Sequence, residues 1–403
     1  MLAWLAPLME VVAHGQQPLT ISEAVGRALQ SHPLLAASGE RVQVASGLRT
    51  QASLRPNPRF YFQTENWRPS FPNGSGAGDF TDTFSYFSQT IETAGKRARR
   101  VEAASTVVER ADLEKELLAR QIAARVKLAY WNAVGAQKLY ELLLTNGTNF
   151  RQIIQYHEIR VREGAMAEAD LLKVRLEGER LEIARNTANL EAERARIQLF
   201  REMGQTEFPS VPLAESLDAE IHPAAADYNQ ALQNRTEIKL VRQAAAEADA
   251  NLRLQQAYAK PNVDGIFGYK RTSGYNTMLG GIQVDLPFAN RNQGNIAASQ
   301  ASRRVVQSEM AATEALVRAE VRAAQAEVEY RRKQVSETFK GLLERATESS
   351  RIALAAYREG GSDLLRLLDA ERARIEIQLL YYRTLMEYHQ SLVSLETAMG
   401  VTP

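Results

Sequence analysis

The sequence contains no cysteine, which excludes a disulfide framework, a thiolate metal site and a lipid-modified N-terminal cysteine. It also lacks an excess of charge of either sign, because 49 Lys and Arg residues are balanced by 48 Asp and Glu residues. Without a basic surface the chain does not attract nucleic acid, so no nucleic-acid partner is expected. Beyond the N-terminus, no apolar run approaches the roughly 18 residues that a membrane-spanning helix requires. If the chain crosses a membrane, we expect it to do so as strands.

Catalytic patterns are also missing from the sequence. The segment GSGAG (74–78) lacks the lysine and the following helix of a phosphate-binding loop. The histidines are scattered, with no pair at the short spacing that places two imidazoles on one metal ion. We therefore predict a protein that is not an enzyme and has no catalytic residues, no cofactor and no metal site. The histidines are His14, His32, His157, His222 and His389.

The first residues form an apolar stretch, in which Ala13-His14-Gly15 resembles the small-residue pattern of a signal cleavage site. The stretch is atypical because Glu10 interrupts it and no basic residue precedes Arg27. We expect an atypical signal peptide over residues 1–15, with its true start upstream. The alternative is a frayed N-terminus.

The chain repeats itself. Residues 161–175 read VREGAMAEADLLKVR, and residues 357–369 read YREGGSDLLRLLD. Both halves end on Met-Gly, at 203–204 and at 399–400. The spacing between corresponding segments drifts between about 193 and 205 residues, which indicates an old duplication with small insertions. A proline-rich segment, FPSVPLAESLDAEIHP, separates the halves and predicts a linker.

Hydrophobic periodicity predicts the same order of elements in each half. A first helix, over 20–54 in the first half, precedes a hairpin of alternating apolar and polar residues. A very long proline-free helix follows, and a shorter helix returns after the Arg-Glu-Gly turn. The expected organisation is repeat 1 over 19–205 (helix, hairpin 58–92, long helix 96–162, helix 168–203), a linker over 206–226, and repeat 2 over 227–401 (helix, hairpin 262–288, long helix 295–358, helix 363–399).

The two hairpins carry the prediction of a membrane protein. Strands of roughly ten residues cross a bilayer when tilted. Four strands cannot close a barrel, and an open sheet edge in lipid leaves unpaired backbone groups that cost several kcal/mol each. Three copies supply twelve strands, so an obligate homotrimer is expected. The alternative is that the hairpins are soluble and pack against the helices, but the aromatic residues clustered at the hairpin ends favour a membrane girdle.

The order of helix, hairpin, very long helix and returning helix, repeated once, resembles the TolC-type outer-membrane efflux channels. The segments SQTIETAGKRARR (88–100) and DLPFANRNQGNIAAS (285–299) are similar to the CzcC-like branch, which serves heavy-metal and cation efflux. The resemblance implies a mainly α fold with membrane β-hairpins: a duplicated subunit whose trimer forms a 12-stranded β-barrel continued by a long α-helical barrel. Its loops at 68–79 and 271–276 would face outward.

The same resemblance implies the outer-membrane channel component of a tripartite efflux system, located in the outer membrane and extending into the periplasm. Its expected partners are outer-membrane lipid, a periplasmic adaptor (membrane fusion protein) and an inner-membrane RND-type pump. Heavy-metal cations are the expected substrates. Two other readings stay open: a duct for drug efflux or type I protein secretion, and, in a different class, a coiled-coil scaffold that does not transport.

The resemblance also implies a periplasmic gate near the second Arg-Glu-Gly turn. Asp369 matches an acidic position of the family, whereas Arg366 takes the place of an earlier one. These two residues lie one helical turn apart, a spacing that favours a salt bridge within or between chains. Asp363, Asp170 and Lys173 near the turns are further gate candidates, although both aspartates also suit helix N-caps. Adaptor contacts are expected at the turns themselves: Arg162, Glu163, Gly164, Ala165, Arg358, Glu359, Gly360, Gly361 and Ser362.

Overall fold

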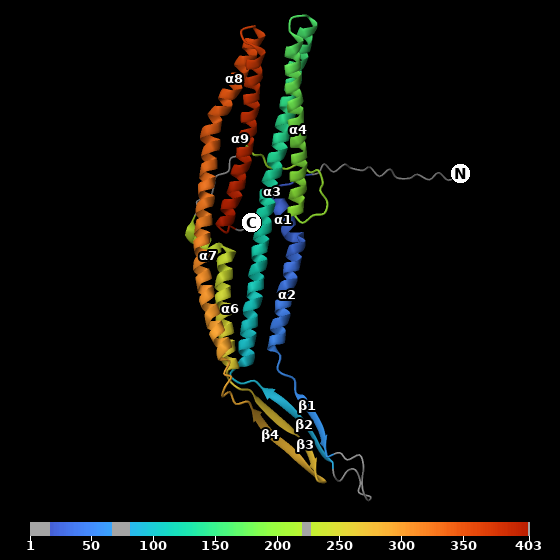
Figure 1. The fold of residues 1–403 in the computed structure, drawn as a ribbon, viewed down its shortest axis with the longest axis vertical. Helices are drawn as coiled ribbons and strands as arrows, with labels where there is room; N and C mark the ends of the chain where they lie inside the picture. Colours follow the sequence, from blue (N-terminus) through green and yellow to red (C-terminus); the bar gives the residue numbers. More distant parts are fainter. Residues whose placement is uncertain (1–16, 67–80, 220–226, 402–403) are drawn as a thin grey trace, which may run out of the picture. The chain divides into compact units, whose positions relative to one another are not determined.

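The computed structural model describes residues 17–66, 81–219 and 227–401. The expected signal peptide at 1–15, the outward loop at 68–79 and the end of the linker at 220–226 lie outside these residues. The described chain is mainly helical with two β-hairpins, so the predicted mainly α subunit with two hairpins is confirmed. It forms two compact units, one of residues 37–117 and 236–316 and the other of the remainder (Figure 1).

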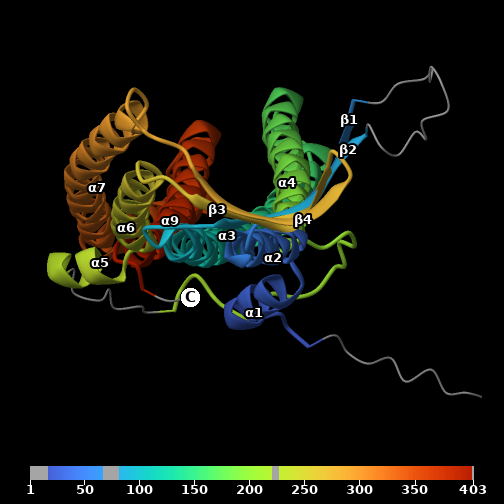
Figure 2. The same ribbon diagram turned by 90° about the horizontal axis from the view of Figure 1, so that it is seen from below.

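The first of these units contains a four-stranded antiparallel sheet, in the order β1-β2-β3-β4 (Figure 2). β3 and β4 are joined by Ser273 and Gly274, which both have positive φ. Two such residues form the tight turn that suits the twist of a hairpin. The loop expected over 271–276 is therefore wrong, because both strands continue into that range. The strands are β1 (Arg59–Glu65), β2 (Asp82–Ile91), β3 (Val263–Thr272) and β4 (Tyr275–Val284).

One face of the sheet is apolar although no described residue covers it. The register places Phe60 opposite Phe87, and Phe87 opposite Phe267. These side chains are 60%, 58% and 63% exposed. Met278 and Ile282 on β4 continue the same face, because residues two apart on a strand point to the same side. The opposite face carries more polar residues, including Gln63, Lys270 and Gln283, so the sheet has an apolar face and a polar face.

Helices α2 (Pro33–Ser53) and α6 (Thr236–Tyr258) run beside the first part of α3 (Lys96–Arg162) and of α7 (Gln293–Lys333) in this unit. Charged pairs connect them: Arg253 lies 2.7 Å from Glu102, and Arg303 lies 2.9 Å from Asp249. Their side chains are partly exposed, so each pair adds about 0.2–1 kcal/mol to the stability of the fold.

The other unit begins with α1 (Ile21–Ser31), which corrects the single helix predicted over 20–54. The helix breaks at His32, whose ψ of 124° is extended, and α2 begins at Pro33. A residue before proline is pushed out of the helical region, and proline suits the first helical turn. The second repeat has a corresponding break at Arg235, between α5 (Tyr228–Asn234) and α6, where ψ is also 124° although Thr236 rather than a proline follows.

The long helices of the two repeats differ. α3 is a continuous helix of 67 residues. The single helix predicted over 295–358 is instead α7, a π-helix at Gln334–Phe339 and α8 (Lys340–Arg358). A π-helix accommodates an extra residue without ending the helix. Because no proline marks the position, the sequence pattern did not predict the π-helix. The returning helices are α4 (Glu168–Glu202) and α9 (Leu364–Ala398).

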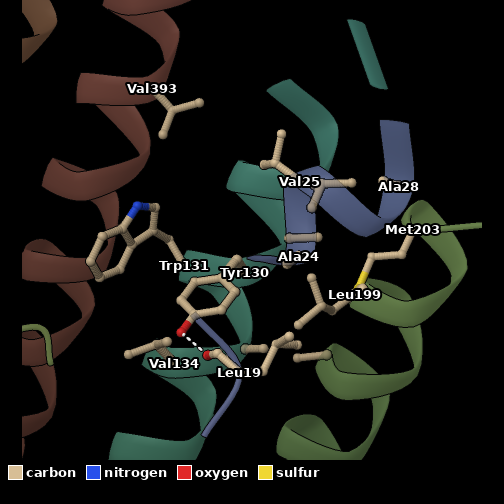
Figure 3. Close-up of a cluster of buried hydrophobic side chains, with 14 of the residues drawn as sticks. Leu19, Ala24, Val25, Ala28, Tyr130, Trp131, Val134, Leu199, Met203 and Val393 are labelled. Carbon is tan, nitrogen blue, oxygen red and sulfur yellow. Dashed lines mark hydrogen bonds between the residues drawn. The ribbon is translucent and has the colours of Figure 1, made fainter. Parts of the chain in front are cut away.

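A hydrophobic core ties α1, α3, α4 and α9 together around Tyr130 and Trp131 (Figure 3). The Tyr130 hydroxyl donates a hydrogen bond to the Leu19 carbonyl oxygen at 2.7 Å. Leu19 also forms a β-bridge with Leu213, in the segment between the repeats. Leu217 of that segment is buried in the same core. The described part of the linker is therefore packed against the helices rather than being a loose connection.

Candidate functional site

Each Arg-Glu-Gly turn is a helix C-terminus of one defined type. In the first, the Ala165 N–H donates to the Arg160 carbonyl, while Gly164 has a φ of +73° and bonds back to Val161. In the second, Gly361 bonds to Ala356 and Gly360 has a φ of +77°. This is the Schellman motif, in which glycine takes the left-handed position that a Cβ disfavours. The sequence repeats the tripeptide because two helices end in the same way.

The returning helices begin differently after these turns. Asp363 is the N-cap of α9, and its Oδ1 accepts a hydrogen bond from the Arg366 N–H at 2.9 Å. Ala167 is the N-cap of α4 and makes no side-chain hydrogen bond. Asp170 lies inside the first turn of α4, where it pairs with Lys173 at 3.1 Å. The N-cap role considered for Asp170 is therefore wrong, and the start of α9 is the better fixed of the two.

An apolar cluster joins the α3–α4 hairpin to α9 just below the turns. Phe150 from α3 and Val174 from α4 pack with Leu364, Leu367 and Leu368 at the start of α9. All five side chains are buried. Separating the hairpins would expose this surface, at about 25 cal/mol for each Å² of apolar area returned to water. The cluster therefore favours the arrangement in which the two hairpins touch.

An ion pair crosses between the hairpins one further turn along α9. The Arg372 guanidinium bonds to the Glu177 carboxylate of α4. The same guanidinium lies 3.6 Å from Asp369. Only 10% of the Glu177 side chain is exposed, against 43% for Arg372. The hydrogen bond from Arg372 outweighs burial and lowers the pKa of Glu177 below its ordinary value, so the carboxylate is charged at neutral pH.

A buried histidine links α3 to α8. His157 Nδ1 lies 2.7 Å from the Ile153 carbonyl oxygen, which can only accept, so this nitrogen carries the proton. Nε2 then accepts a hydrogen bond from the Tyr357 hydroxyl at 2.9 Å. The two rings are also stacked, with centroids 5.5 Å apart. Tyr357 directly precedes the second Arg-Glu-Gly turn, so the pair holds the end of α8 against α3.

A polar network continues along α9 beside a cavity of about 650 Å³. Arg374 donates to Glu371 on its own helix at 2.8 Å and to the Asn146 side chain of α3 at 2.9 Å. Glu371 also accepts a hydrogen bond from Ser350 of α8. Because these groups satisfy each other, a buried carboxylate and guanidinium are held in a helical core at tolerable cost. The network and the ion pair give α9 polar contacts to α3, α4 and α8.

The structure places the predicted gate residues in three separate pairs, of which Asp170–Lys173 is described above. Arg366 lies 3.9 Å from Asp363, and Asp369 pairs with Arg372. The expected salt bridge between Arg366 and Asp369 is therefore not made within the chain. Asp363, Arg366, Lys173 and Asp369 are all largely exposed, whereas Glu177 is buried. The described chain thus leaves most of the predicted charges on the surface near the turns.

Sequence reasoning missed the contacts between the hairpins. Glu177 follows Leu171 and Val174 at helical spacing, and Glu371 follows Leu364 and Leu367 in the same way. A carboxylate in an otherwise apolar, core-facing row is a signal for a buried partner. The signal does not name that partner, because Arg372 is 195 residues away from Glu177.

The described residues also bear on two other classes of site, a metal centre and a membrane-spanning helix. No group of three or more His, Cys, Asp or Glu side chains in residues 17–66, 81–219 and 227–401 is arranged to hold a metal ion. Within the same residues, none of the helices combines the length and the apolar character needed to cross a membrane.

The chain is similar to known proteins over nearly its whole length. The family model "Outer membrane efflux protein" matches residues 24–205 and 228–401. Over 388 residues the chain is 23% identical to the cobalt-zinc-cadmium resistance protein CzcC of Cupriavidus metallidurans, covering 95% of this chain and 90% of that protein. The crystal structure of CusC is similar with a TM-score of 0.80 and 18% identity, over 96% of this chain and 93% of that one. The open state of the MtrE outer membrane channel of Neisseria gonorrhoeae is similar with a TM-score of 0.76 and 19% sequence identity, over 94% of this chain and 88% of that one.

Proposed function

The chain belongs to the outer membrane efflux protein family, and on that premise we propose that it is the outer-membrane channel of a tripartite system that exports heavy-metal cations. The observation that carries the channel is the exposed apolar face of the sheet, with Phe60, Phe87 and Phe267 in register. A soluble protein rarely exposes such a patch, whereas a membrane strand needs one.

The proposal of metal cations rests on similarity over almost the full chain to a protein named for cobalt, zinc and cadmium resistance. Drug efflux and type I protein secretion are the competing roles within the same family.

Closure of the sheet requires further copies of the chain. β1 and β4 are the edge strands, and an edge exposed to lipid leaves its N–H and C=O groups unpaired. We propose a homotrimer in which β4 of one copy pairs with β1 of the next. Twelve strands lie within the range of known membrane barrels.

The region of the two Arg-Glu-Gly turns is the proposed gate and adaptor site. Opening requires the α8–α9 hairpin to move away from the α3–α4 hairpin, because the Glu177–Arg372 pair and the Phe150 cluster hold them together. Asp369, Arg366, Asp363, Asp170 and Lys173 are the proposed charged lining of the gate. An adaptor that binds the separated hairpins more tightly than the joined ones would shift the equilibrium toward the open state.

The adaptor would bind at the turn residues Arg162–Ala165 and Arg358–Ser362. Gly361 suits this role, because a Cβ added there would meet only the Ala356 carbonyl oxygen at 3.6 Å. An inner-membrane RND-type pump is the proposed third component, which selects the substrate that the duct releases.

A deletion strain tests both the class and the substrate. The strain is grown on graded zinc, cobalt, cadmium, copper and silver salts and on a panel of drugs. Loss of resistance to one or more of the metal salts alone, restored by the gene on a plasmid, supports metal efflux. Sensitivity confined to drugs, or loss of a secreted protein, would replace the substrate. A chain recovered in the soluble fraction rather than as outer-membrane trimers would overturn the channel itself.

A further inference from the structure

A polar row crosses the otherwise apolar face of the sheet, at the end that carries the β3–β4 turn (Figure 1). The register places Thr64 opposite Thr83 and Thr83 opposite Arg271. Arg271 in turn lies opposite Asn276 of β4. Arg271 is four residues from Phe267 on β3, and residues an even number apart on a strand share a face. The row therefore belongs to the face that carries the exposed phenylalanines.

The apolar part of this face ends at the polar row. The row directly before it includes Phe62, Tyr269 and Met278, which are all exposed. Eight residues separate Val263, at the start of β3, from Arg271, which is about 26 Å along the strand. A strand tilted by about 40° crosses about 20 Å of bilayer over that length, close to the apolar band of about 25 Å in membrane barrels. The side chain of Arg271 therefore starts near the edge of that band, and its long stem can reach the headgroups.

Arg271 has no anionic partner within the described part of the chain. Its Nε is enclosed and makes no hydrogen bond, and the residue as a whole is partly exposed, so a ligand would meet the terminal Nη atoms. The carboxylates of the next row, Glu65 and Asp82, lie opposite each other on the other face of the sheet. Asn66 holds Asp82 there at 2.9 Å. A charge on a lipid-facing surface is costly unless a counter-ion is supplied, so the counter-ion of Arg271 has to come from outside the described chain.

The residues on either side of Arg271 add neutral hydrogen-bond donors. Directly opposite residues of antiparallel strands have Cβ atoms about 4.5–5.5 Å apart. The Tyr269 hydroxyl donates to Asn276 Oδ1 at 2.6 Å, which leaves the N–H groups of Asn276 Nδ2 as donors. The Thr83 hydroxyl is a further donor on the other side. A planar guanidinium flanked by an amide and a hydroxyl matches a group with several anionic oxygens, and arginine is well suited to phosphate.

We propose that Arg271, with Asn276 and Thr83, binds the phosphate group of a lipid in the outer leaflet of the membrane. The proposal rests on the membrane sheet of the proposed function, whose hairpin turns face outward. A lipid is favoured over a free phosphate ion because the apolar row lies directly beside the site, so the acyl chains of the same molecule can cover Phe62 and Met278. Each copy of the chain carries one such row, so a homotrimer would have three sites.

The probe for the test is diphosphoryl lipid A, a glycolipid with two phosphate groups. It is titrated into the full-length protein in detergent, and the bound lipid is counted by native mass spectrometry. The comparison probe is the same lipid after its phosphates have been removed. We expect the dephosphorylated lipid to bind about tenfold or more weakly, and equal binding of the two lipids would overturn the proposal. Equimolar inorganic phosphate should not displace lipid A; displacement would overturn the assignment to a lipid.

Arg271→Gln removes the charge and keeps a polar side chain. The matched control is Lys270→Gln, because Lys270 is the neighbouring residue and lies on the opposite face, with Nζ 5.2 Å from the centroid of the Phe84 ring. Binding of lipid A should weaken about tenfold or more in Arg271→Gln and stay unchanged in Lys270→Gln. Unchanged binding in Arg271→Gln, or equal weakening in both variants, would refute the site. If Arg271→Gln fails to assemble, Asn276→Asp decides: its carboxylate lies opposite Arg271 and neutralises it, so retained binding of lipid A refutes the site.

Vesicle flotation distinguishes a failure of this site from a failure of the proposed function. The native protein, reconstituted with phosphatidylcholine vesicles, should float with them in a density gradient without lipid A. A protein that stays out of the vesicles would overturn the membrane sheet and this site with it. A protein that floats, but binds lipid A without dependence on phosphate or on Arg271, would overturn this site alone.

Discussion

Removing the Arg372 side chain should loosen the contact between the α3–α4 hairpin and α9. In Arg372→Ala the Glu177 carboxylate stays largely buried and loses its main hydrogen-bond donor, while Arg180 remains at 3.5 Å. Breaking a fully buried pair from one side costs about 3–5 kcal/mol. Because 43% of Arg372 is exposed, solvent screens part of this, and we expect about 1–2 kcal/mol per subunit.

That energy translates into channel opening, because 1.4 kcal/mol is a factor of ten in an equilibrium constant. In planar bilayers, the purified protein, which we propose to be a trimer, should therefore show an open-to-closed ratio raised by roughly tenfold for each subunit that opens. The matched control is Arg351→Ala, which removes an exposed arginine paired with Glu348 on its own helix at 2.6 Å. The two side chains of that pair are 70% and 52% exposed, and no change in opening is expected.

The pH dependence of the effect has a defined sign. Arg372 lowers the pKa of Glu177, so the stabilisation is present above the ordinary pKa of a glutamate and is lost as the pH falls through the lowered value. The native protein and Arg372→Ala should differ at neutral pH and converge in acid. In a double-mutant cycle, Glu177→Gln should remove most of the effect of Arg372→Ala. Equal opening of the native and Arg372→Ala channels at neutral pH would refute the ion pair as a closing contact.

Three further substitutions test the other assignments. Asp369→Ala removes a charge held 3.6 Å from Arg372 and should raise the conductance of isolated trimers; an unchanged conductance would exclude Asp369 from the gate. Gly361→Trp should abolish efflux. Trimers should still form, because the Cβ of the new side chain would clash with no neighbouring atom; full efflux would exclude this turn as the adaptor contact. Gly268→Ala should reduce the yield of folded trimers on gels by severalfold, because a Cβ would lie 2.4 Å from the Cα of Tyr86, whereas Gly280→Ala, in open space, should fold normally. Equal yields of these two variants would contradict the close strand packing at Gly268.

The parts of the fold that sequence could predict are those encoded locally. The glycine of each Arg-Glu-Gly turn ends a helix by its own conformational freedom, and the alternation along β4 follows from the two-residue period of a strand. The missed helix break at His32 was equally local, since Pro33 follows it directly in the sequence.

The contacts of the candidate site could not be predicted from local sequence patterns, because they join residues far apart in the chain. Glu177 and Arg372 come from different repeats, as do His157 and Tyr357, and only the tertiary fold brings each pair together. The predicted pairing of Arg366 with Asp369 used helical spacing alone. In the structure Arg366 instead lies near Asp363 at the start of the helix, and Asp369 lies near Arg372, which contacts the neighbouring hairpin.

The π-helix at Gln334–Phe339 determines the direction in which the side chains of α8 point around the helix axis. One residue added to an α-helix turns the downstream side chains by about 100° around the axis. Ser350 and Tyr357, which reach α9 and α3, owe their directions to that offset. Deleting one residue from the π-helix would keep the helix and its composition but rotate both contacts away from their partners. The second repeat thus carries an angular adjustment that α3, an unbroken helix, does not have.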